Sequence, residues 1–298
     1  MSEHLAVPGP DGRTIEALTG GDPGGFGLLY HGGSPSAAAR FAPMDEAARA
    51  HGLRLVTYSR PGYGDSSPRP AAGRYADDVI ESVAVLDALG IEEFVTVGWS
   101  GGGPRALACA ALLPDRCRAA ASLAGVAPYH GAGLDWFAGM AEENHEEYHA
   151  AERGREAYEA YLVESFLPIL GASPDELSEA MGGLVPPVDR AVLRGAFADW
   201  LSRTFRHAGA QGVVGVRDDG LAAVAPWGFE LSQIRVPVAV WQGRADAMVP
   251  YAHGEWLAAA VPGARAHLFE DEGHLSLVER FDEVLADLTR LAGLAREA

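Results

Sequence analysis

The stretch that decides the fold is FVTVGWSGG, residues 94–102, with the helical run Pro104–Leu113 behind it. Phe94–Val97 has the β-type composition of a short buried strand, and Gly98–Gly102 fits the pattern Gly-x-Ser-x-Gly. A sharp strand-to-helix turn strains its central residue, and only small neighbours two positions away let the backbones pass closely. We therefore expect Ser100 to stand exposed above a sheet, at a helix N-terminus whose N–H groups favour developing negative charge.

Strand and helix patterns alternate on both sides of this turn. Before it lie the β-type runs Phe26–Tyr30 and Leu53–Tyr58, and after it lies Ala119–Leu123. The segment Tyr75–Leu89 repeats apolar residues at three- and four-residue steps and is followed by Gly90, a helix stop signal. Because parallel strands need a crossover that is normally a helix, this alternation predicts an α/β fold with a mostly parallel, doubly wound sheet.

The middle of the chain differs from both ends. Residues 128–229 contain no convincing strand run and carry many more acidic residues than arginines. The α/β pattern then returns as two strands and two helices, predicted at Val236–Trp241, Tyr251–Val261, Ala266–Phe269 and Leu275–Leu291. We predict a core made of residues 1–127 and 230–298, with residues 128–229 inserted as a helical cap.

A serine hydroxyl is a poor nucleophile without a base, and the base needs an acid to orient it. Asp246 lies on the loop after the strand Val236–Trp241, and His274 lies on the loop after the next strand. The carboxyl ends of parallel strands share one edge of the sheet, so both loops are expected to open on the face that carries Ser100. Asp246 as a helix cap and His274 as a helix-start residue stay open as alternatives. His253 and His267 are weaker candidates for the base.

Taken together, these residues resemble the α/β-hydrolase family, particularly its serine-nucleophile branch with a helical cap. That branch includes small esterases, proline iminopeptidases and carbon–carbon bond hydrolases. The resemblance covers nearly the whole core, because the order Ser100, Asp246, His274 is the family's order. It implies an oxyanion hole made by the backbone N–H groups of Gly101 and Gly33, and it implies no metal or organic cofactor.

Two loops depart from patterns common in the family. Ser59 stands where an Asp commonly precedes Arg60, in a loop (residues 60–66) that we interpret as structural. The sequence His31-Gly32-Gly33-Ser34-Pro35 differs from the His-Gly-Gly-Pro-Gly often seen in iminopeptidases, which argues against a peptidase.

The nucleophile narrows the expected chemistry. Family members that displace at saturated carbon, such as epoxide hydrolases, place Asp at this turn, whereas Ser100 suits attack on a carbonyl. The expected activity is cleavage of a small carboxylic ester or related acyl substrate through an acyl-enzyme. Alternatives are a proline-type aminopeptidase, a cofactor-free lyase, or a non-catalytic ligand-binding module on the same scaffold. The sequence leaves the acyl group, the leaving group and the oligomeric state open.

Charge and composition restrict the partners and the compartment. The 298 residues carry 41 acidic against 23 basic side chains, a formal charge of −18 that would repel nucleic acids and anionic lipids. Cys109 and Cys117 lie in or beside apolar stretches, as expected for buried thiols in a reducing compartment. The N-terminal residues carry acid where a signal peptide needs base, so we expect a cytoplasmic protein with a small-molecule substrate.

Some residues are assigned to the substrate pocket on weaker grounds. Trp99 within the turn is a candidate for the pocket wall, and Tyr129 and Trp136 at the start of the cap are tentative ones. The acid-rich run Glu142–Glu164 could anchor a cationic amine, but a solvated helix face is the favoured interpretation.

Overall fold

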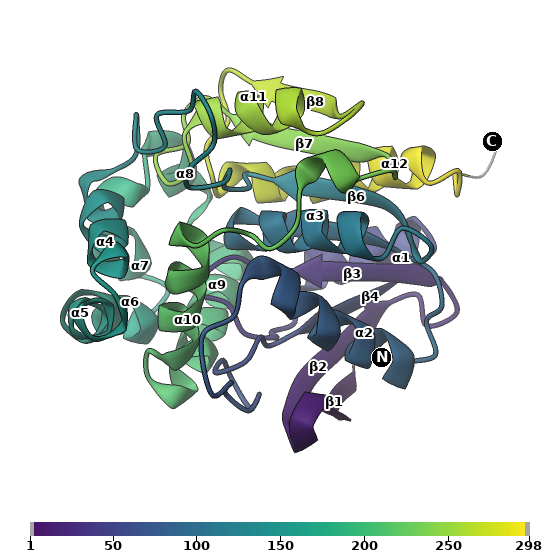
Figure 1. The fold of residues 1–298 in the computed structure, drawn as a ribbon, viewed down its shortest axis with the longest axis horizontal. Helices are drawn as coiled ribbons and strands as arrows, with labels where there is room; N and C mark the ends of the chain where they lie inside the picture. The colour runs from purple at the N-terminus through teal and green to yellow at the C-terminus, as the bar shows by residue number, and fades with distance from the viewer. Residues whose placement is uncertain (1–2, 296–298) are drawn as a thin grey trace.

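The computed structural model describes residues 3–295, and the described residues form one eight-stranded sheet flanked by helices (Figure 1). The strands are β1 (Glu3–Pro8), β2 (Thr14–Gly21), β3 (Phe26–His31), β4 (Leu53–Tyr58), β5 (Phe94–Trp99), β6 (Cys117–Leu123), β7 (Val238–Gly243) and β8 (Arg265–Phe269). Their spatial order is β1-β2-β4-β3-β5-β6-β7-β8. β2 pairs antiparallel with β1 and β4, and every other neighbouring pair is parallel. The predicted α/β fold is confirmed.

Helices cover both faces of the sheet. The core helices are α1 (Ala42–Ala50), α2 (Val79–Ala88), α3 (Gly103–Leu112), α11 (Tyr251–Ala260) and α12 (Phe281–Leu291). α2, α3 and α11 contact one face, and α1 and α12 contact the other. Alternate residues of each central strand enter the two cores, as Leu28 and Leu29 of β3 do. Burying one such side chain contributes roughly 1.5–3 kcal/mol.

A second group of helices lies between β6 and β7 in the sequence, and we call residues 128–229 the helical segment. Its helices are α4 (Glu142–Glu152), α5 (Arg155–Tyr161), α6 (Leu167–Gly171), α7 (Leu177–Ala180), α8 (Pro187–Val192), α9 (Gly195–Ala208) and α10 (Val214–Val224). They lie together beyond the carboxyl ends of the central strands, at the left of Figure 1. That this segment is a separate cap domain with the predicted boundaries stays a proposal.

Helix starts differ slightly from the predictions. The last predicted helix divides into a 3-10 stretch, Ser276–Arg280, and α12, while α3 begins after a 3-10 turn at Ser100–Gly102. Within the described residues, every helix is too short or too polar to cross a lipid bilayer.

Candidate active site

Ser100 occupies a strained turn between β5 and α3. Its φ is +56°, in the left-handed region that costs a residue with a Cβ of order 1 kcal/mol or more. The neighbouring glycines make the turn possible, since a Cβ on Gly98 would collide with the Gly102 carbonyl oxygen. A Cβ on Gly102 would likewise collide with the His31 carbonyl. The sequence pattern and the local geometry therefore agree at this position.

His274 and Asp246 lie on loops after β8 and β7, and the two side chains are bonded to each other. His274 Nδ1 lies 2.8 Å from Asp246 Oδ2, and both side chains are almost fully buried. The other carboxylate oxygen of Asp246 accepts the backbone N–H groups of Met248 and Val249, each at 2.8 Å. Burial disfavours the charged imidazole, but the Asp246 carboxylate outweighs it and raises the pKa of His274 above its usual value.

Asp189 belongs to this site but was not predicted from the sequence. It is fully buried on α8, and its carboxylate accepts the backbone N–H groups of His274, Leu275 and Ser276 at 2.8–2.9 Å. These three bonds anchor the loop that carries the imidazole to the helical segment. No sequence spacing links the two residues, because Asp189 precedes His274 by 85 positions.

Ser100 and His274 line the same cavity, and the space between its lining residues, together with the solvent in front of them, amounts to about 930 Å³. Its wall from the helical segment is largely apolar, with Phe166, Ile169, Met181, Leu184, Phe205 and Val216. No direct hydrogen bond joins Ser100 Oγ to His274 among the described residues, and such bonds commonly tighten only when substrate binds.

The aromatic residues assigned to the pocket divide into two groups. Trp99 lines the cavity, where its Nε1 donates to the His274 carbonyl oxygen at 3.2 Å. Tyr129 and Trp136 pack on each other elsewhere, with ring centroids 4.8 Å apart, and Trp136 donates to the Ala127 carbonyl. These two rings belong to a small core beside Val126 and are not part of the cavity wall described here.

Both predicted oxyanion donors lie beside Ser100. Gly33 and Gly101 line the cavity, and a Cβ on Gly33 would stand only 3.2 Å from the Ser100 Cβ. The Gly33 N–H makes no hydrogen bond within residues 3–295, so it is free to donate into the cavity. Two backbone N–H groups near a nucleophile are what a tetrahedral oxyanion needs.

Two carboxylates of the helical segment also line the cavity, in opposite surroundings. Asp219 on α10 is paired with Arg60 and Arg105. Burial alone would raise the pKa of Asp219, but these two guanidinium groups together lower it to about 2. The loop that contains Arg60, interpreted from the sequence as structural, is thus paired with a residue of the cavity wall.

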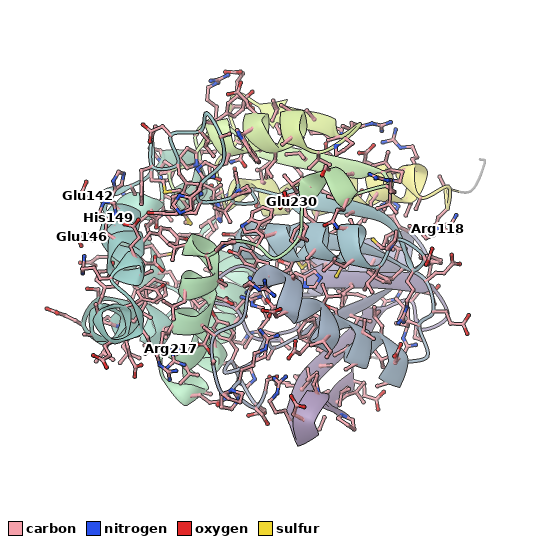
Figure 2. All side chains as sticks on the ribbon, in the orientation of Figure 1. Arg118, Glu142, Glu146, His149, Arg217 and Glu230 are labelled. Carbon is pink, nitrogen blue, oxygen red and sulfur yellow. The ribbon has the colours of Figure 1, made fainter. Side chains whose placement is uncertain are left out.

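Glu147 on α4 is the contrasting carboxylate. One of its oxygens accepts the Tyr158 hydroxyl at 2.7 Å, and no cationic side chain pairs with it in the described part of the chain. Burial raises the pKa of Glu147 to about 7, against the opposing effect of the Tyr158 bond. The acid-rich run is therefore not uniformly solvated: Glu142 and Glu146 are exposed on α4 (Figure 2). Glu147 is half-buried and lines the cavity.

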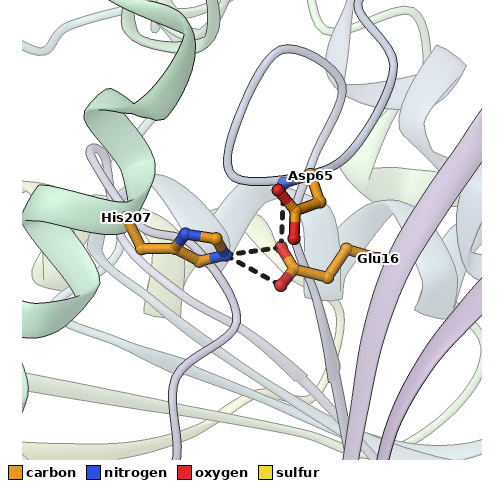
Figure 3. Close-up of side chains that lie close together, drawn as sticks. All are labelled: Glu16, Asp65 and His207. Atoms are coloured by element: carbon orange, nitrogen blue, oxygen red, sulfur yellow. Dashed lines mark hydrogen bonds and ion pairs between the residues drawn. The ribbon is translucent and has the colours of Figure 1, made fainter.

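One other group of potential ligand residues converges within the described chain. Glu16 on β2, Asp65 and His207 on α9 bring ligand atoms within 4.8 Å of one another (Figure 3). His207 Nε2 lies 2.7 and 2.9 Å from the two Glu16 oxygens, and Glu16 also accepts the Ser59 hydroxyl. These bonds explain why the three side chains lie together: they connect α9 to the sheet. None of the three residues lines the cavity.

Comparisons with known proteins agree with this geometry. A family model described as the alpha/beta hydrolase fold matches residues 27–281. The chain is 27% identical to a 2-hydroxymuconate semialdehyde hydrolase of Pseudomonas putida, covering 85% of this chain and 81% of the relative. It is 26% identical to a pimeloyl-[acyl-carrier protein] methyl ester esterase of Aromatoleum aromaticum, covering 75% and 81%.

Solved structures show the same architecture. The structure of a bromoperoxidase from Bacillus anthracis superposes with a TM-score of 0.73 at 19% identity, covering 97% of this chain and all of that one. At such low identity the likeness concerns the fold alone. Because the family model spans most of the chain and the relatives are hydrolases, this protein belongs to the α/β-hydrolase family and is a hydrolase of that superfamily.

Proposed function

We propose that the protein is a serine hydrolase that cleaves a small carboxylic ester through an acyl-enzyme. His274 takes the Ser100 proton while Ser100 Oγ attacks the ester carbonyl, and the N–H groups of Gly33 and Gly101 stabilise the oxyanion. His274 then protonates the departing alkoxide. In the second half, water attacks the acyl-enzyme, His274 accepts its proton, and the acid leaves as Ser100 regains its hydrogen.

One observation carries the proposal: a serine strained at φ +56° shares its cavity with a histidine whose Nδ1 is bonded to a buried aspartate. The bond to Asp246 holds the imidazole in the tautomer that leaves Nε2 free to accept a proton. The name of the Aromatoleum relative, a methyl ester esterase, favours an ester as the substrate class.

The first experiment replaces Ser100 with alanine and follows hydrolysis of p-nitrophenyl esters. We expect kcat to fall by about 10⁵-fold or more with an unchanged melting temperature, as when the nucleophile of a serine hydrolase is removed. A fluorophosphonate probe should label the wild type at Ser100 and leave S100A unlabelled. Undiminished turnover in S100A would reject the proposal, and tight ligand binding without labelling of the wild type would favour a binding module instead.

Glu147 favours a second candidate, an enzyme that acts on substrates bearing a protonated amine, such as the N-terminal residue of a peptide. A carboxylate in an apolar cavity without a cationic partner is costly unless the ligand supplies the missing charge. Proline-type amides should be compared with isosteric esters of equal size. The variant E147Q should lose turnover of the amine-bearing substrates only, and E146Q, on the exposed side of the same helix, is the matched control.

A further inference from the structure

Arg60 holds both peptide units that flank Gly33. Its Nη1 donates to the Gly32 carbonyl oxygen at 2.8 Å, and its Nη2 donates to the Gly33 carbonyl oxygen at 2.7 Å. In a trans peptide the carbonyl and the N–H point in opposite directions. With the Gly32 carbonyl turned toward Arg60, the N–H of Gly33 is directed away from Arg60, and it has no partner within residues 3–295.

Arg105 holds the other side of the proposed oxyanion hole, through the peptide unit that follows Gly101. It lies on α3, is almost fully buried, and its Nη1 donates to the Gly101 carbonyl oxygen at 2.6 Å. That bond fixes the peptide unit that follows Gly101, at the start of the helix behind Ser100. Each donor segment is thus held by the guanidinium group of one buried arginine.

Asp219 of the helical segment connects the two arginines. Its Oδ2 accepts Arg60 Nη2 at 2.6 Å, and its Oδ1 accepts Arg105 Nη2 at 2.5 Å. The same carboxylate accepts the hydroxyl of Tyr63 at 2.8 Å and the hydroxyl of Ser34, the residue after Gly33. Asp219 itself is 7% exposed, so water does not replace it readily in this network.

Charge explains why this carboxylate is needed there. Two guanidinium groups that approach one point repel each other, and burial makes the repulsion stronger than in water. Asp219 lies between them as the shared anion, and a bidentate arginine pair has a narrowly defined geometry. Without that anion, Arg60 loses the carboxylate with which it is paired, and Arg105 keeps its ion pair with Asp78 but loses its link to Arg60.

We propose that Asp219 is a positioning residue for the oxyanion hole: supplied by α10, it locks Arg60 and Arg105, which hold the backbone of Gly33 and Gly101. This inference rests on the proposed function, since it presupposes that those two N–H groups bind the oxyanion. It assigns the helical segment a part in the acyl-transfer step in addition to its place in the cavity wall.

The test is D219N, which keeps the shape of the side chain and removes its charge. We expect kcat for p-nitrophenyl esters to fall by roughly 10- to 100-fold with KM nearly unchanged, because loss of one oxyanion donor costs about 10²–10³ and a displaced donor costs less. Affinity for an alkyl trifluoromethyl ketone, whose serine adduct carries an oxyanion, should fall by a similar factor. The midpoint of the pH profile should stay in place, since His274 keeps its bond to Asp246.

D218N is the matched control, because it removes the same charge from the neighbouring position of α10. Asp218 pairs with Arg217 and makes no bond to Arg60 or Arg105 in the described part of the chain. We expect its kcat to equal that of the wild type. Melting temperatures of both variants establish that each is folded under assay conditions.

Tyr63→Phe makes the inference testable even where D219N does not fold. It removes one hydrogen bond to Asp219 and leaves both arginines paired, so we expect a smaller loss of kcat, about two- to tenfold. Wild-type kcat in folded D219N, or in Y63F when D219N is unfolded, overturns the inference. A rise in KM alone, or a shifted pH midpoint, overturns it too. If the proposed function itself is wrong, S100A retains turnover, which distinguishes that outcome from a failure of the inference about Asp219.

Discussion

The cavity wall supplied by the sheet and the wall supplied by the helical segment differ in how their polar groups are satisfied. On the sheet side, His274 is bonded to Asp246, and the loop that carries His274 is also held by Asp189 of the helical segment. On the helical side, Asp219 is bonded by two arginines and two hydroxyl groups, whereas Glu147 accepts one hydroxyl among the described residues. The proposed catalytic groups thus come from the sheet, while the carboxylates of the helical segment either support them or, at Glu147, stay without a charged partner in the described chain.

The largest effect on kcat is expected from removing the charge of Asp246 on the sheet side of the cavity. In D246N the imidazole loses the carboxylate that fixes its tautomer, and comparable changes lower kcat by about 10⁴-fold. Activity needs neutral His274, so it rises with pH through the pKa of that residue. Because Asp246 raises this pKa, the midpoint of the kcat/KM profile should lie above 6.5 in the wild type and move to lower pH in D246N.

The pH profiles are measured between pH 5 and 9 with an ester whose leaving group does not titrate in that range. D218N is a suitable control, since it removes a charge without touching the His274 pair. A D246N midpoint equal to or higher than that of the wild type would contradict the role given to Asp246.

On the helical side, removing the charge of Glu147 should raise the stability of the protein at high pH. The pKa of Glu147 is raised from 4.5 to about 7, so ionisation in the folded state lowers stability progressively as pH rises between these values. At pH 8 the cost amounts to about 3 kcal/mol, and at pH 4 it is absent. E147Q should therefore unfold at higher denaturant concentration than the wild type at pH 8, and the difference should shrink on acidification.

Urea unfolding at pH 8 and pH 5 measures this effect. E146Q removes the same charge from the exposed side of α4 and should change the free energy of unfolding by less than about 0.5 kcal/mol. Equal stabilisation by E146Q and E147Q would mean that general charge repulsion, and not burial of Glu147, causes the effect.

The smallest effect on catalysis is expected at Trp136, which packs behind Tyr148 of the cavity wall and does not itself line the cavity. W136F loses the hydrogen bond to the Ala127 carbonyl, so the free energy of unfolding should fall by about 1 kcal/mol. Its kcat/KM should stay within about twofold of the wild type, since a packing change at a residue that does not line the cavity acts mainly on stability. Changed preference among ester chain lengths in W136F would contradict the placement of this ring, and W99F is the comparison that should show such a change.

The fold could be predicted from the sequence where the structure of a segment depends on residues within that segment. The apolar run before Gly98, the glycines on either side of Ser100 and the strand ends before Asp246 and His274 are all read within a few residues. The N-terminal hairpin of β1 and β2 was not predicted, because polar residues interrupt the sequence of both strands, even though β2 is largely buried between β1 and β4.

Contacts between segments far apart in the chain could not be predicted from the sequence. Asp219 meets Arg60 across 159 positions, and no spacing rule links them. Glu147 and Glu146 are chemically identical in the sequence, and the packing of α4 against Tyr158 separates the half-buried Glu147 from the exposed Glu146. Aromatic residues such as Tyr129 carry no signal that tells a cavity wall from a small core.

The three backbone bonds that Asp189 accepts tie the imidazole loop to α8. Because these bonds come from α8, the position of the imidazole depends on how the helical segment packs as well as on the ends of β7 and β8.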